Sequence, residues 1–142
     1  MSAPAADPAI ADRKQTQSLR TPDDIVIVRH LVRQWSSQLG FSLVEQTKMV
    51  TAASELGRNT VVYGGGGSFH LEVVSGPGRS GLRLIFEDNG PGIADVDQAL
   101  RDGFSTGGGL GLGLGGARRL VNEFDITSSP GHGTRVAITR WK

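Results

Sequence analysis

The sequence has no cysteine among its 142 residues. Disulfide bonds and cysteine-based zinc sites are therefore excluded. The only histidines are His30, His70 and His132, and they lie far apart along the chain, so a metal centre built on histidine is not expected. The lack of cysteine is typical of the cytoplasm, and we expect the protein to be cytoplasmic.

Long apolar runs and an excess of one charge are also missing. No apolar run reaches the ~18–20 residues that a membrane-spanning helix needs. The opening segment, MSAPAADPAIADRK, has no apolar core of signal-peptide length. The formal net charge is +1, which gives no electrostatic reason to expect nucleic-acid binding. We therefore expect neither a membrane nor a nucleic acid among the partners.

Glycine, by contrast, is abundant and clustered. It accounts for 21 of the 142 residues, and this share is about twice the average usage. The first 39 residues contain none, whereas residues 64–67 are all glycine and seven more lie within residues 107–116. Glycines that only served turns would be scattered, so the clusters indicate places where the backbone approaches something closely.

Periodic patterns predict the secondary structure. Thr21 is suited to cap a helix, and apolar residues then recur at three- and four-residue steps until Gly40 ends it. Ser42 and Glu45 have capping-box spacing, which predicts a second helix to about residue 62. The other expected elements are a short helix within 94–106, a third helix near 112–122, and strands over 16–20, 68–74, 82–87, 124–128 and 134–141.

These elements define one domain with a short leading segment. Residues 1–15 are rich in Ala, Pro and Asp without periodicity, which predicts a flexible tail before a domain over residues 16–142. Hairpins make part of the expected sheet antiparallel. About three helices with four or five strands favour an α/β (α+β) two-layer sandwich, in which a mixed sheet carries the helices on one face.

Two polar residues share one face of the second predicted helix. Glu55 and Asn59 are four residues apart, so their side chains lie one helical turn from each other. A carboxylate and a carboxamide oxygen in this arrangement are able to hold a hard cation or a water molecule. A solvated polar stripe is the alternative explanation for this pair.

The segment Asp88-Asn89-Gly90-Pro91-Gly92-Ile93 directly follows an apolar strand. Ligand groups commonly lie where a buried strand emerges, and a carboxylate there can accept a hydrogen bond from an exocyclic amine. Gly90 and Gly92 lack side chains, which allows a flat ring to approach. An ordinary Asn-Gly-Pro-Gly turn is the alternative.

A glycine-rich segment covers residues 107–116 and continues into a predicted helix. Free N–H groups at a helix N-terminus are suited to phosphate. Gly111, Gly113 and Gly116 formally match G-x-G-x-x-G, but a loop rather than a strand precedes them, so this match is weak. No Gly-Lys-Ser/Thr sequence occurs, so a phosphate site here would have no P-loop lysine.

The last motif, Gly131-His132-Gly133-Thr134, is by itself an ordinary turn before the final strand. The order of all four motifs resembles the sequence boxes of the GHKL ATPase superfamily, whose nucleotide pocket is the Bergerat fold. The resemblance covers about residues 20–142. The stretches SELGRN, EDNGPGI, DGFSTGGGLGLGL and GTRVAITRW are most similar to RsbT-type switch kinases, which belong to the small serine kinases and anti-sigma factors of bacterial partner-switching pathways.

The resemblance implies a role for each motif. Asn59 would bind the Mg²⁺ that bridges the phosphates of ATP, and Glu55 would be the catalytic general base. Asp88 would accept the adenine amine, with Thr134 beside it through water. The nucleotide-binding residues implied are Asn59, Asp88, Gly90, Gly92, Ile93, Thr106, Gly107, Gly108, Gly109, Leu110, Gly111, Leu112, Gly113 and Thr134.

The implied function is that of a serine/threonine protein kinase in bacterial stress signalling. Such a kinase phosphorylates a STAS-domain antagonist and then switches partners to activate a downstream PP2C-type phosphatase or similar regulator. One alternative is an anti-sigma factor that sequesters a sigma subunit. Another is a binding module that uses ATP only structurally, although such a module has no need of Glu55.

Overall fold

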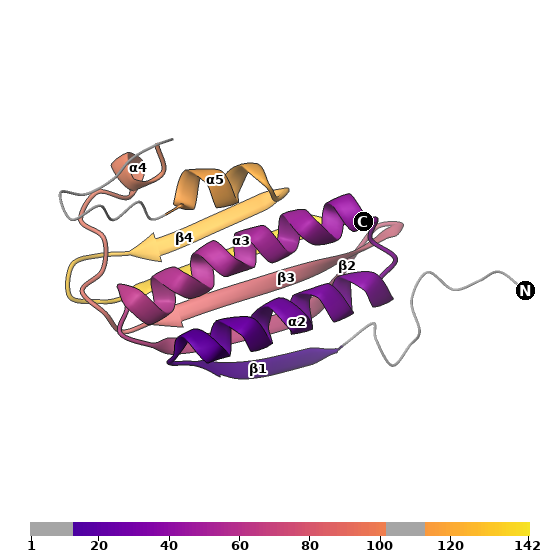
Figure 1. The fold of residues 1–142 in the computed structure, drawn as a ribbon. Coiled ribbons are helices and arrows are strands. Elements are labelled where there is room, and N and C mark those ends of the chain that lie inside the picture. Colours follow the sequence, from indigo (N-terminus) through magenta and orange to yellow (C-terminus); the bar gives the residue numbers. More distant parts are fainter. Residues whose placement is uncertain (1–12, 102–112) are drawn as a thin grey trace, which may run out of the picture.

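The computed structural model describes residues 13–101 and 113–142, which form two layers (Figure 1). Five strands make one sheet in the order β1-β2-β3-β5-β4. The elements, in chain order, are β1 (Lys14–Leu19), α2 (Pro22–Gln38), α3 (Leu43–Val62), β2 (Gly67–Gly76), β3 (Arg79–Asp88), α4 (Val96–Ala99), α5 (Leu114–Arg119), β4 (Glu123–Ser128) and β5 (Thr134–Trp141).

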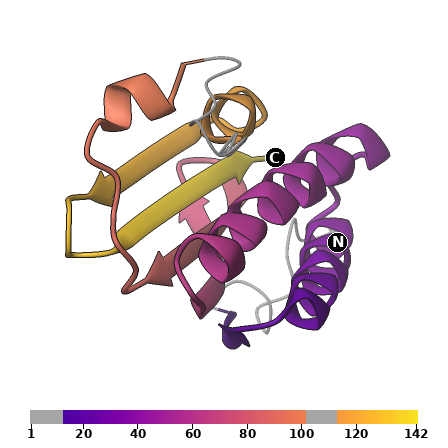
Figure 2. The ribbon, with the colours of Figure 1, turned by 60° about the vertical axis from the view of Figure 1, so that its left-hand side comes forward.

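The apolar core lies between the sheet and the helices α2, α3 and α5, which cover one face of it (Figures 1 and 2). Trp35 of α2 and Met49 of α3 are fully buried against the sheet. Below them, the rings of Phe69 on β2 and Phe86 on β3 pack with centroids 5.0 Å apart. The expected two-layer architecture, with helices on one face, is therefore confirmed.

All described strand pairings are antiparallel, so the prediction of a mixed sheet is wrong. The reason lies in the connections. Two antiparallel helices, α2 and α3, join β1 to β2, so the chain returns to the sheet running opposite to β1. Hairpins then join β2 to β3 and β4 to β5, and β5 inserts beside β3.

Several element boundaries differ from the sequence-based expectation: β2 and β3 are longer than the expected 68–74 and 82–87, and β1 and α5 also differ. Strand β1 begins at Lys14, within the range expected for the tail, because Lys14 pairs in register with Glu72 of β2. Helix α5 ends at Arg119, earlier than the expected residue 122. The carbonyl of Leu120, just after this helix, accepts a hydrogen bond of 3.0 Å from Arg140 of β5.

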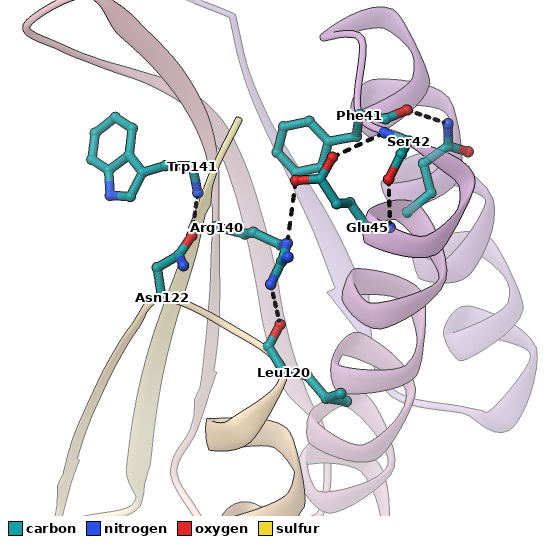
Figure 3. A network of polar contacts seen from close by, with 8 residues as sticks. Phe41, Ser42, Glu45, Leu120, Asn122, Arg140 and Trp141 are labelled. Carbon is teal, nitrogen blue, oxygen red and sulfur yellow. Dashed lines mark hydrogen bonds and ion pairs between the residues drawn. The ribbon is translucent and has the colours of Figure 1, made fainter.

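A polar network ties the beginning of α3 to the end of α5 (Figure 3). The hydroxyl of Ser42 accepts from the N–H of Glu45, and the Glu45 carboxylate accepts from the N–H of Ser42, both at 3.1 Å. Nε of Arg140 lies 3.7 Å from the same carboxylate. The hydrogen bond from the Ser42 backbone is the main reason that the pKa of Glu45 is lowered.

This network predicts a stability that depends on pH. Because the pKa of Glu45 is lower in the folded state than its ordinary value of 4.5, its carboxylate stabilises the fold above that value and ceases to do so as the pH falls through the folded pKa. Glu45→Gln should lower the free energy of unfolding at pH 7 by roughly 0.5–1.5 kcal/mol. Urea unfolding of both proteins between pH 7 and pH 3 measures the difference, which should disappear at the acidic end.

Asp23→Asn is the matched control, because Asp23 lies in the first turn of α2 but makes no capping box. It should cost less at pH 7 than Glu45→Gln. An equal cost for both variants would contradict a specific role for the Glu45 network.

Candidate functional site

A cavity of about 530 Å³ lies between the C-terminal half of α3, the end of β3 and the segment around α4. Its walls are mainly apolar, with Leu56, Phe86 and Val136 among the lining residues. Cavities of this size and character are typical of small-molecule sites. Five residues that the sequence assigned to nucleotide binding line it: Asn59, Asp88, Gly92, Ile93 and Thr134.

The other predicted site residues have different positions. Glu55 does not line the cavity but faces the beginning of α5, where a Cβ added at Gly113 would lie 2.5 Å from Oε2 of Glu55. Gly113 is the N-cap of α5 and has a φ of +66°. Gly90 does not line the cavity, but its backbone N–H donates a hydrogen bond to the Asp88 carboxylate. Thr106, Gly107, Gly108, Gly109, Leu110, Gly111 and Leu112 lie outside the described residues.

Asp88 ends β3 and is paired in register with Thr134, the first residue of β5. Its half-buried carboxylate accepts a hydrogen bond of 2.9 Å from the N–H of Gly90 through Oδ1. Burial raises the pKa of Asp88, while hydrogen bonds from the backbones of Gly90 and Thr134 partly oppose this effect. The carboxylate is therefore a positioned acceptor inside an apolar cavity, suited to an amine donor on a ligand.

The turn beside Asp88 depends on glycine at two points. Gly92 has a φ of +77°, and a Cβ there would collide with the carbonyl oxygen of Ser129. Gly133 has a φ of +72°, and a Cβ there would collide with the carbonyl oxygen of Asp88. These glycines allow close approach between segments of backbone, and this approach brings the end of β3 against the turn before β5.

Ser128, at the end of β4, is a site residue that the sequence did not reveal. Its hydroxyl accepts from the N–H of Ile93 at 2.8 Å, donates to the carbonyl of Gly133 at 3.0 Å, and lies 2.8 Å from Oγ1 of Thr134. It therefore joins two of the predicted motifs. A serine before a Pro-Gly turn carries no sequence pattern that would have distinguished it.

Within residues 13–101 and 113–142, no group of three or more His, Cys, Asp or Glu side chains is placed to hold a metal ion. Among the described helices, none combines the length and apolar character required to cross a membrane.

Residues 44–142 match the family described as Histidine kinase-, DNA gyrase B-, and HSP90-like ATPase, and the chain belongs to this family. Membership implies that it binds a nucleotide. The chain is homologous to "Serine/threonine-protein kinase RsbT" of Bacillus subtilis (strain 168), with 46% identity over 123 residues, 87% of this chain and 92% of that protein. It is also 31% identical to "Anti-sigma F factor" of Clostridium kluyveri (strain NBRC 12016) over 77% of this chain and 80% of that protein.

Solved structures support the fold. The RsbU and RsbW domains of a Mycobacterium tuberculosis protein align with a TM-score of 0.59 at 21% identity, over 92% of this chain and 33% of that chain. The SiaB-SiaC complex from Pseudomonas aeruginosa aligns with a TM-score of 0.53 at 11% identity, over 94% of this chain and 92% of that chain. At these identities the similarity concerns the fold alone.

The electrostatics of Asp88 predict a gain of stability when its charge is removed. Because burial raises its folded pKa above the ordinary value of 3.8, the ionised group destabilises the nucleotide-free fold as the pH rises through the folded pKa. Asp88→Asn should therefore raise the free energy of unfolding at pH 7, by less than about 1 kcal/mol. Urea unfolding without nucleotide at pH 7 and at about pH 3 should show the gain only at pH 7. A less stable variant at pH 7 would mean that the hydrogen bonds outweigh burial.

Proposed function

We propose that this chain is an ATP-dependent protein-serine/threonine kinase that phosphorylates a STAS-domain antagonist. The proposal rests above all on one observation: Asn59 and Asp88 line a single apolar cavity in a chain that is 46% identical to a serine/threonine kinase. The phosphorylated antagonist would release the kinase, which would then activate a downstream PP2C-type phosphatase or similar regulator. This cycle would take place in the cytoplasm.

The cavity fits ATP in its chemistry. Asp88 would accept a hydrogen bond from the exocyclic amine of adenine, and Thr134 would contact the ring through a water molecule. The apolar walls, including Phe86 and Ile93, would exclude water around the base. The glycine-rich segment over residues 107–113 would surround the phosphates with backbone N–H groups.

Asn59 would supply a single side-chain oxygen to Mg²⁺. One protein ligand is enough, because this ion keeps several waters and is otherwise held by the phosphates. When bound, Mg²⁺ would neutralise charge that develops on the phosphates. Asn59 lies one helical turn beyond Glu55, so its side-chain oxygen would hold the ion close to the Glu55 carboxylate.

Glu55 would be the general base for phosphoryl transfer. Its carboxylate would take the proton from the hydroxyl of a serine or threonine on the protein substrate as that oxygen bonds to the γ-phosphorus. The bond between the γ-phosphorus and the bridging oxygen would break, and ADP would leave with the electron pair. The place of Glu55 beside Gly113, where the glycine-rich segment meets α5, suits this role.

An anti-sigma factor is the second candidate function. The observation that favours it is the identity of 31% to an Anti-sigma F factor over most of the chain. In that case the partner retained by the unmodified protein would be a sigma subunit, and phosphoryl transfer would only release it. Co-purification with a sigma factor would favour this candidate over activation of a phosphatase.

The first prediction from this proposal concerns Glu55. Glu55→Gln should reduce transfer of labelled phosphate from ATP to a STAS-domain protein by about 10²–10⁴-fold, because the amide has no basic oxygen. ATP binding, measured by calorimetry, should change little. Glu72→Gln is the matched control, since Glu72 lies on β2 outside the cavity and should leave transfer unchanged.

Equal transfer by the wild-type protein and Glu55→Gln would show that Glu55 is not the base. Absence of transfer by the wild-type protein, with partner binding retained, would instead support a module that uses ATP only structurally.

The second prediction concerns Asn59. Asn59→Ala should remove the dependence of ATP binding on Mg²⁺, because the variant lacks the side-chain oxygen proposed to hold the ion. Titration of ATP with Mg²⁺ and with EDTA should give the same affinity for this variant and different affinities for the wild-type protein. Gln34→Ala removes an exposed amide from α2 and should behave like the wild-type protein. Magnesium dependence that survives in Asn59→Ala would assign the ion to other groups.

A further inference from the structure

The run of glycines at residues 64–67 joins α3 to β2 beside the cavity, and three of the four have a structural explanation. Gly65 and Gly66 have φ values of +73° and +101°, which form the turn itself. Gly67 is the first residue of β2, and a Cβ there would collide with the carbonyl oxygen of Glu87 on β3. The turn and the strand pairing thus account for residues 65–67, but not for Gly64.

Gly64 lies against the side chain of Asp88. A Cβ built at Gly64 would lie 2.6 Å from both Cβ and Oδ2 of Asp88, and its three nearest atoms all belong to that side chain. Real Cβ atoms essentially never approach another atom this closely. The backbone of Gly64 has a negative φ, so its close contact, and not its conformation, requires glycine.

Gly64 also contacts the other parts of the site. A Cβ added at Gly90 would lie 2.7 Å from Cα of Gly64 and 3.1 Å from Oδ1 of Asp88, so the two glycines lie against each other and both border the Asp88 carboxylate. Gly90 donates to Oδ1, while Oδ2 faces Gly64. The N–H of Gly64 donates to the carbonyl of Asn59 at 2.9 Å, which fixes Gly64 to the end of α3.

We propose that Gly64 is a positioning residue for recognition of the adenine amine. The inference rests on the proposed function, in which Asp88 accepts a hydrogen bond from that amine. A side chain at Gly64 would turn or displace the Asp88 carboxylate, because the contact is with that group itself. The three atoms nearest to the new Cβ all belong to Asp88, so we expect the loss to concern recognition of the adenine ring.

The experiment compares ATP with purine riboside triphosphate, which lacks the exocyclic amine, as ligands of the full chain. A hydrogen bond to a charged acceptor corresponds to about 10–100-fold in affinity, so the wild-type protein should prefer ATP by at least about tenfold. Gly64→Ala should reduce this preference to less than about threefold while binding of the analogue stays the same. Gly57→Ala is the matched control on α3, because its Cβ would make only ordinary contacts of 3.8 Å with Ile25 and Phe86.

The outcomes separate the two proposals. If the wild-type protein shows no preference for ATP, the assigned role of Asp88 fails and this inference fails with it. If the wild-type protein prefers ATP and Gly64→Ala keeps that preference, the inference fails while the proposed function stands. Equal weakening of both ligands in Gly64→Ala would indicate a purely structural role and would also overturn the inference.

A second variant covers the case in which Gly64→Ala does not fold. Combination with Asp88→Gly removes the three atoms that lie nearest to the new Cβ. Thermal unfolding of the double variant close to that of Asp88→Gly alone would support the inference, because the conflict would then come from Asp88. A double variant that remains unfolded would overturn it.

Discussion

The site depends on one half-buried carboxylate, that of Asp88, at the point where β3 leaves the sheet. Burial makes its charge unfavourable, and the backbone N–H groups of Gly90 and Thr134 compensate for part of that penalty. Donors of this kind reach a carboxylate only if the backbone itself comes close. The contacts of Gly64 and Gly133 with Asp88 show how absent side chains permit this approach.

Helix α3 connects this carboxylate to the rest of the fold. Its buried face, which includes Met49 and Leu56, packs on the sheet, while Asn59 lines the cavity. Its beginning is joined through Arg140 to the end of α5, and further along it Glu55 lies against Gly113 at the beginning of α5. Helix α3 therefore contacts both ends of α5, and the contact at the beginning of α5 is adjacent in sequence to the glycine-rich segment proposed to bind phosphates.

Much of this site could be predicted from sequence because its motifs are local. The spacing of Glu55 and Asn59 follows from the helical repeat alone, and Asp88 is marked by the apolar strand before it. Ser128 could not be predicted, since its importance comes from hydrogen bonds to Ile93 and Thr134, which belong to separate segments. The proposed role of Gly64 could not be predicted for the same reason. Gly64 lies between α3 and β2, whereas its contact, Asp88, lies at the end of β3.

By itself, the sequence determined where the helices begin, which strands form hairpins and which motifs carry polar groups, since these follow from periodicity, capping and turn chemistry over a few residues. The tertiary structure alone showed that β5 pairs with β3, which places Asp88 in register with Thr134, a proximity that the sequence indicated only through the family resemblance. It also decided that the sheet is antiparallel and that Glu55 faces α5 rather than the cavity. These relations depend on packing between distant segments, which no local pattern encodes.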